Sequence, residues 1–193
     1  MAWSEFRKGK GLKQDVMEFE KNLEQNIFEL SRNLKNKKYR HSSYTGFYIT
    51  DPKLRHVHKA SVRDRVLHHS VFQTLNPIFE PTFISTSFSC RVNKGTHKGV
   101  EAVKRMLNKA SGNNTQTCYA LKCDIQKFFD SIDQAVLIKI LSNKINDTET
   151  MELFRELIGS YKSEARYERE RERERERVKA LRALPIREYP LAT

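Results

Sequence analysis

The stretch Tyr119–Asp133, YALKCDIQKFFDSID, contains the residues whose types and spacing best fit a catalytic or metal-binding site. Apolar side chains alternate over residues 119–123, which predicts a strand that is buried on one face. This strand runs into a carboxylate, Asp124, and an aromatic ring, Phe129, follows five residues later. We therefore expect Asp124 to lie where the strand stops, at an open edge of a sheet.

A carboxylate at the end of a rigid strand is well placed to bind a metal ion. Mg²⁺ prefers hard oxygen ligands, and enzymes that transfer phosphoryl groups hold it with a few carboxylates and the phosphates of the nucleotide. Asp124 offers a side-chain oxygen and Ile125 a backbone carbonyl. The alternative is that Asp124 terminates the strand or forms a turn and that both neighbouring phenylalanines are core residues. The spacing alone favours this structural interpretation.

Two helices are expected after this strand. Ser131 and Gln134 have the spacing of a capping box, and the apolar run 136–141 follows them. A second helix is expected to begin at Asp147 and to place Met151 and Phe154 on its buried face.

The letters DIQKFFDSID resemble the first catalytic-aspartate motif of reverse transcriptases, especially those of bacterial group II introns, retrons and diversity-generating retroelements. The resemblance implies that Asp124 binds the two catalytic Mg²⁺ ions. It implies that Phe129 is the gate that blocks a ribose 2′-hydroxyl and so selects deoxynucleotides. The partners it implies are an RNA template, a DNA primer and dNTPs.

The composition fits a protein that meets an acidic partner. The formal net charge is +12, and nucleic acid is the usual acidic partner of a cytoplasmic protein, although anionic membranes and simple solubility also explain such a charge. No run is apolar enough for a membrane span or a signal core, so we expect no membrane association and a cytoplasmic location. The three cysteines lack the spacing of zinc ligands and are expected to be reduced.

The N-terminal segment, residues 1–38, is expected to be helical. Apolar residues recur every three or four positions from Lys13 to Leu34, which predicts one amphipathic helix. Trp3 and Phe6 are expected to pack onto it rather than to contact nucleic acid.

Residues 39–61 predict a hairpin, because two alternating runs flank an Asp-Pro turn signal. Its second strand is basic, and Lys53, Arg55 and Lys59 are suited to binding a triphosphate or a template phosphate. The alternative is a solvated edge ribbon whose lysines discourage strand pairing. Without the motif at Asp124 the two interpretations weigh equally.

A helix is expected from Ser61, which with Asp64 resembles a capping box, to about Leu75. The run SVRDRVLHHSVFQTLNPIFEPTF, residues 61–83, resembles the segment that follows the fingers hairpin in the same reverse transcriptases. Arg63 and Arg65 are therefore candidates for nucleic-acid backbone contacts or for pairing with Asp64, and we prefer the structural role. His68 and His69 are expected on the helix surface.

The run SFSCRVNKGTHKGVEAVKRML, residues 87–107, resembles a further fingers segment of this family. Arg91 and Lys94 are our candidates for template-primer or nucleotide phosphate contacts. Thr96 is expected to cap the following helix, whose apolar residues should face the core; these are Val100, Val103 and Met106.

The fold class expected from these resemblances is α+β, the fingers and a partial palm of a right-hand polymerase. Residues 39–118 would be fingers-like, 119–163 the start of the palm, and 164–193 a charged, low-complexity tail. The tail contains alternating Arg and Glu, which pair poorly in a helix and predict a solvated segment.

The last residues suggest a lost reading frame. If Arg187 is encoded by AGG or CGG, deletion of one base after Ile186 yields LPIGNILSQ, which resembles the family's next motif. Two-metal phosphoryl transfer needs carboxylates from two strands, yet no Asp-Asp dipeptide occurs in the sequence. We expect an RNA-directed DNA polymerase domain truncated before its second aspartate motif and inactive alone. The alternatives are a non-catalytic RNA- or DNA-binding fragment and a decayed product that does not fold stably.

Overall fold

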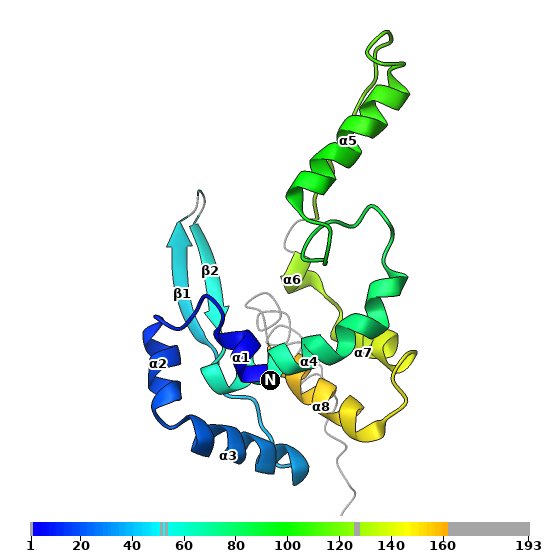
Figure 1. Cartoon of the computed structure of the whole chain (residues 1–193). Coiled ribbons are helices and arrows are strands. Elements are labelled where there is room, and N and C mark those ends of the chain that lie inside the picture. Colours follow the sequence, from blue (N-terminus) through cyan, green and yellow to red (C-terminus); the bar gives the residue numbers. More distant parts are fainter. Residues whose placement is uncertain (1, 51, 53, 126–127, 162–193) are drawn as a thin grey trace, which may run out of the picture. The chain divides into compact units, whose positions relative to one another are not determined.

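The computed structural model describes residues 2–50, 52, 54–125 and 128–161, with helices and one pair of strands (Figure 1). The chain forms two compact units, the first ending at Asp124 and the second beginning at Ile125. The expectations for Lys53 and for the tail at 164–193 lie outside the described residues. Within those residues, no helix combines the length and the apolar content needed to cross a bilayer.

Three short helices begin the first unit: α1 (Ala2–Arg7), α2 (Gln14–Lys21) and α3 (Leu23–Lys35). The prediction of one continuous helix from Lys13 to Leu34 is wrong, because the backbone leaves helical geometry at Asn22, with φ −122° and ψ 41°. This break lets both helices contact α4 (Val62–Phe79).

Helix α4 is the element around which the N-terminal helices pack. Ser61 caps it by accepting a hydrogen bond from the Asp64 amide, as predicted, but the helix continues past Leu75 and includes Pro77 near its end. A turn of 3-10 helix, η1 (Glu80–Thr82), follows. The buried core between these elements is small and apolar: Phe6, Val16, Val62 and Val66, with Trp3, Phe19 and Ile27 packed against it.

The predicted hairpin is present. Strand β1 (Thr45–Thr50) pairs antiparallel with β2 (Leu54–Lys59), in a register that runs from Thr45 opposite Lys59 to Thr50 opposite Leu54. In the described part of the chain this is the only sheet, and it has two strands.

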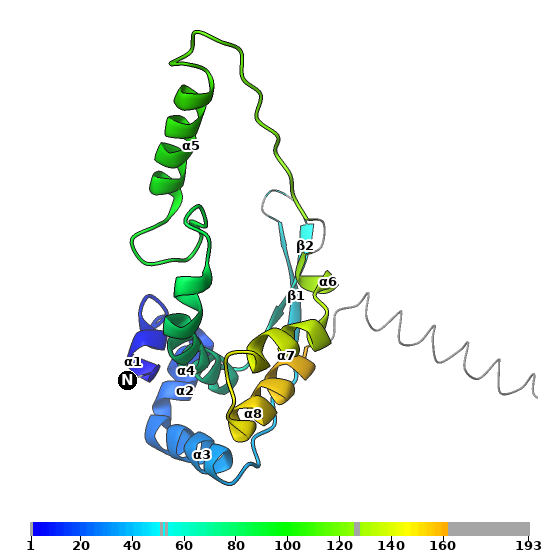
Figure 2. The ribbon, with the colours of Figure 1, turned by 90° about the vertical axis from the view of Figure 1, so that its right-hand side faces the viewer.

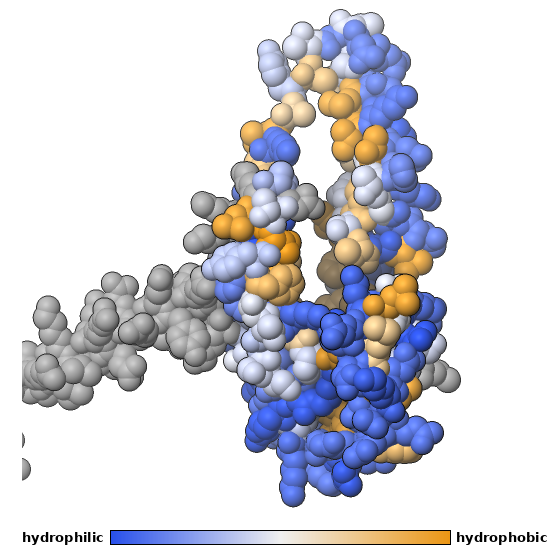
Figure 3. Space-filling model, turned by 90° about the vertical axis from the view of Figure 1, so that its left-hand side faces the viewer, coloured by the Kyte–Doolittle hydropathy of each residue, from blue (hydrophilic) through white to orange (hydrophobic). Residues whose placement is uncertain are grey.

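Helix α5 (Thr96–Ala110) follows a glycine turn, but two expectations about it are wrong. Gly95 stands at the N-cap with φ 99°, so Thr96 is the first helical residue and does not cap. Val100, Val103 and Met106 are 63%, 53% and 53% exposed rather than buried in a core. Within the described part of the first unit this face is largely exposed, and Figure 3 shows hydrophobic side chains along α5.

The strand predicted over residues 119–123 is also not formed. The chain after α5 is extended but pairs with no strand of the described residues, since β1 and β2 pair only with each other (Figure 2). Tyr119 and Leu121 are 94% and 90% exposed. An extended segment becomes a strand only when a neighbour satisfies its backbone groups, and the described part of the chain supplies no such strand.

The second unit contains α6 (Phe128–Ser131) and two helices that contact each other, α7 (Gln134–Ser142) and α8 (Thr148–Gly159). The prediction of a capping box at Ser131 is wrong. Asp133 caps α7 instead, because its side chain accepts hydrogen bonds from the amides of residues 135 and 136 at 2.8 and 3.1 Å.

Helix α8 begins as predicted. Asp147 accepts a hydrogen bond from the Thr150 amide at 2.7 Å, and Met151 and Phe154 are buried. The Gln134 side chain joins the two helices by donating to the Ile158 carbonyl at 2.8 Å.

Candidate functional site

The carboxylate of Asp64, at the start of α4, is fully buried, with 0% of the residue exposed. It accepts hydrogen bonds from the Tyr39 hydroxyl at 2.8 Å and the Ser61 hydroxyl at 2.7 Å. The Ser42 amide donates to it at 3.0 Å. Arg63 donates from Nε and from one terminal nitrogen at 3.0 and 2.9 Å. Asp64 therefore fixes the connection that leads into β1 to the first turn of α4.

These donors decide the charge of Asp64. Burial alone would raise its pKa, but the hydrogen bonds from Ser61, Tyr39, Arg63 and Ser42 outweigh that effect and lower the pKa to about 2. The carboxylate is therefore ionised at neutral pH. The same Arg63 guanidinium also donates to the Arg40 carbonyl at 2.6 Å. The expected pairing of Arg63 with Asp64 is confirmed.

A second carboxylate, Asp15 of α2, holds two cations from distant parts of the sequence. Lys59 at the end of β2 lies 2.6 Å from Asp15 Oδ2, and Arg65 of α4 donates to the same oxygen. Burial would raise the pKa of Asp15, but these two cations lower it below its usual range. Arg65 thus pairs with Asp15 rather than with Asp64, and Asp15 ties the hairpin to the N-terminal helices.

His68 is not the surface residue that we expected. Its Nε2 lies 3.2 Å from Nε2 of His41, whose side chain is buried, and the two rings lie 5.1 Å apart, tilted by 13°. Burial and the neighbouring His41 lower the pKa of His68.

Arg91 and Lys94 are engaged in the loop before α5. Arg91 pairs with Glu80 at 2.9 Å and donates to the carbonyls of Ile84 and Ser87 at 2.9 and 3.0 Å. Lys94 donates to the Ser85 carbonyl at 2.8 Å. Both cations therefore shape the loop, and their contact with phosphate remains a prediction.

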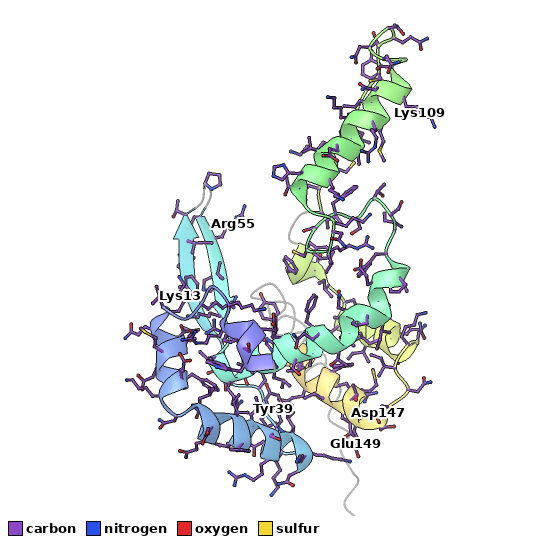
Figure 4. All side chains as sticks on the ribbon, in the orientation of Figure 1. Lys13, Tyr39, Arg55, Lys109, Asp147 and Glu149 are labelled. Atoms are coloured by element: carbon purple, nitrogen blue, oxygen red, sulfur yellow. The ribbon has the colours of Figure 1, made fainter. Side chains whose placement is uncertain are left out.

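Arg55 differs from these cations, because it is exposed near the turn of the hairpin (Figure 4). In the register it stands opposite Ile49, on the face that also includes Lys59. The other face carries Tyr48 and His56, whose rings are stacked at 4.6 Å. Of the two predicted phosphate ligands of the hairpin that lie within the described residues, Arg55 is thus more accessible to solvent than Lys59.

The segment that carries the candidate catalytic residues is open to solvent. Asp124 is exposed at the end of the extended segment, Ile125 is 63% exposed, and Phe129 on α6 is 78% exposed. The Phe129 ring contacts the Phe128 ring edge-on at 5.3 Å. Neither phenylalanine is a core residue, which argues against one part of the structural interpretation of this motif.

The oxygen ligands present fit only part of a magnesium site. The Asp124 carboxylate and the Ile125 carbonyl are the hard oxygens that Mg²⁺ prefers. Across the described residues, however, no three His, Cys, Asp or Glu side chains come together in a metal-binding group. One carboxylate and one carbonyl do not complete the set that holds two ions.

Sequence reasoning missed the carboxylates that organise the basic residues. Asp15 and Glu80 were not singled out, although each is an acidic residue whose partners, Arg65 and Arg91, were. The available signal was charge: a carboxylate in a strongly basic chain can pair with an arginine, but the sequence does not show which arginine the fold brings to it. Asp15 and Arg65 are separated by 50 residues in the sequence.

No family model matches the chain. Curated proteins match it at low identity. LtrA, a group II intron-encoded protein of Lactococcus lactis subsp. cremoris, is 25% identical over 118 residues, which are 61% of this chain and 18% of LtrA. A 91 kDa protein in the cob intron of Schizosaccharomyces pombe is 29% identical over 110 residues, 56% of this chain and 13% of that protein.

A third relative is the YkfC protein of Escherichia coli K12, which is 26% identical over 106 residues, 55% of this chain and 27% of YkfC. The chain thus spans between about an eighth and a quarter of the length of the relatives it matches.

Proposed function

We propose that the chain is part of an RNA-directed DNA polymerase of the reverse transcriptase type, which adds dNTPs to a primer on an RNA template. The observation that carries the proposal is the run Asp124–Asp133, with its exposed carboxylate and exposed aromatic ring. Distant similarity to LtrA and to the cob-intron protein supports it. The fold proposed is the fingers and the first part of the palm of a right-hand polymerase.

In this proposal each exposed group has one task. Asp124 and the Ile125 carbonyl hold Mg²⁺, which would neutralise charge on the phosphates when bound. Phe129 lies beneath the sugar of the incoming nucleotide and excludes a 2′-hydroxyl by its bulk. Arg55 binds phosphate from the hairpin, because it is exposed while Lys59 is paired with Asp15. Arg63, Arg65 and Arg91 keep the supporting elements in place through their internal carboxylate partners.

The chain by itself is proposed to be inactive. Two-metal phosphoryl transfer requires further carboxylates opposite Asp124. The 193-residue sequence contains no Asp-Asp dipeptide, and Asp133 is engaged as the cap of α7.

The test is single-nucleotide primer extension on an RNA template with Mg²⁺. We compare the chain with a frame-restored protein, in which one base is deleted after Ile186 so that the encoded sequence continues through LPIGNILSQ. Extension by the restored protein alone is expected, and Phe129→Ala in that protein should raise incorporation of ribonucleotides relative to deoxynucleotides. Extension by the unaltered chain would refute the proposed inactivity, and no extension by either protein would refute the polymerase assignment.

A second candidate function is RNA or DNA binding without catalysis. The net charge of +12 and the exposed Arg55 favour it. Binding of a labelled RNA that weakens steeply with salt is expected, since cations that neutralise phosphates release counterions. Arg55→Ala should reduce the slope of log affinity against log salt by about 1, while a broad, non-cooperative melt of the chain would indicate that it does not fold stably.

A further inference from the structure

The extended segment before the second unit has the features of an unpaired strand. Leu121 and Ile125 are 90% and 63% exposed, and Cys123 is exposed with a free thiol. The segment belongs to no sheet of the described residues. Unpaired backbone donors and acceptors in an extended conformation are a template for pairing with another chain.

The sequence of this segment is complementary to itself. When two copies of residues 121–125, LKCDI, run antiparallel with Cys123 opposite Cys123, Lys122 of each copy stands opposite Asp124 of the other. In the same register Leu121 stands opposite Ile125. Opposite charges and apolar pairs in facing positions stabilise an antiparallel ribbon, because their Cβ atoms are about 5 Å apart.

We propose that two copies of the chain associate through this antiparallel pairing, centred on Cys123. The symmetry is the reason that a second copy fits better than an unrelated strand. A twofold axis at Cys123 satisfies both Lys122 and both Asp124 side chains at once, as expected of an isologous contact. In the pair Asp124 lies opposite a lysine, so pairing would compete with metal binding by Asp124 as the proposed function has it.

The ribbon would also have one apolar face, formed by Leu121, Cys123 and Ile125. A two-stranded ribbon alone is marginally stable in water and needs a hydrophobic surface to pack on. Helix α5, in the same unit as Leu121 and Cys123, exposes such a surface. With Phe88 it lines an open groove of about 610 Å³ that includes Val100, Val103 and Met106.

Site-directed crosslinking of the whole chain tests the register. Cys90 and either Cys118 or Cys123 are replaced by serine, so that each protein keeps one of these two thiols, and a short bismaleimide is added. The proposal predicts efficient dimer crosslinking through Cys123. It predicts little through Cys118, because the two Cys118 residues would be roughly 34 Å apart along an antiparallel ribbon.

Equal crosslinking through both cysteines, or a monomer by light scattering, would overturn the proposal. A charge exchange provides an independent test, since Lys122 and Asp124 are both exposed and their substitution leaves the monomer's packing intact. Lys122→Asp should weaken the dimer by at least about tenfold, because it places two like charges in facing positions. Adding Asp124→Lys should restore it, and failure of this double variant to do so would refute the pairing of these two residues.

Discussion

Two parts of the first unit use charged and apolar residues in opposite ways. Around α4, cations meet carboxylates inside the fold: Asp64, which is buried, receives five hydrogen bonds, and Asp15, which is partly buried, holds both Lys59 and Arg65. From α5 to Asp124, apolar side chains and a carboxylate face solvent. The contrast indicates that a basic residue of this chain is available to bind phosphate where no internal carboxylate pairs with it.

The largest effect should come from removing the charge of Asp64. Asp64→Asn is expected to lower the free energy of unfolding by about 3 kcal/mol, because it leaves Arg63 partly buried without its counter-charge. Urea melts followed by circular dichroism measure the change. The matched control is Glu101→Gln on α5, where the carboxylate is exposed and lies 4.0 Å from Arg105; it should change stability by less than about 0.5 kcal/mol.

Acid should lower the folding stability of the region around α4 in two stages. The pKa of His68 is lowered by burial and by His41, so the unfolded chain binds a proton more readily and stability falls as pH drops below the ordinary value of 6.5. The pKa of Asp64 is lowered from 3.8 to about 2, so its contribution, roughly 2 to 3 kcal/mol, is present above pH 4 and lost as pH falls toward 2.

Melting temperatures between pH 8 and pH 2.5 measure both stages. His68→Gln should remove the first stage and Asp64→Asn the second. A profile that either substitution leaves unchanged would contradict the assignment of that stage.

The same substitution, valine to alanine, compares a buried apolar residue of α4 with an exposed one of α5. Val66→Ala on α4 should cost about 2 kcal/mol, since Val66 is 3% exposed and truncation leaves a cavity. Val103→Ala on α5 should cost less than about 0.5 kcal/mol, because Val103 is already 53% exposed. Equal losses in thermal or urea melts would mean that the α5 face is covered in solution.

The smallest effect on stability should come from Asp15, whose ion pairs connect the hairpin to the helices. Asp15→Asn should cost about 1 kcal/mol, because its two ion pairs are only partly buried. It should also increase hydrogen exchange of the β2 amides near Lys59. Glu18→Gln on the same helix, which removes an exposed pair with Lys21, is the control and should leave that exchange unchanged.

What the sequence predicted correctly were features with local causes. The caps at Ser61 and Asp147 depend on residues three positions apart, and the hairpin depends on alternation around one turn signal. The break at Asn22 was not predictable from periodicity, because both halves continue the same apolar stripe. It is explained by the packing of two short helices on α4.

The site was predictable only in part, for the same reason. The motif located Asp124 and Phe129 by residue type, and both are exposed as access to a nucleotide would require. The strand expected before Asp124 depends on a neighbour that local alternation does not supply. The partners of Arg65 and Arg91, Asp15 and Glu80, lie 50 and 11 residues away, and only the fold brings them together.

The most direct test of the account compares two aspartates of the motif in the frame-restored protein. Single-turnover primer extension is measured for Asp124→Asn and for Asp133→Asn, in which asparagine can still cap α7. We predict that Asp124→Asn slows extension by on the order of a thousandfold, because it removes a metal-binding charge, and that Asp133→Asn leaves the rate within about twofold. Equal rates for the two variants would contradict the claim that Asp124 is the catalytic carboxylate.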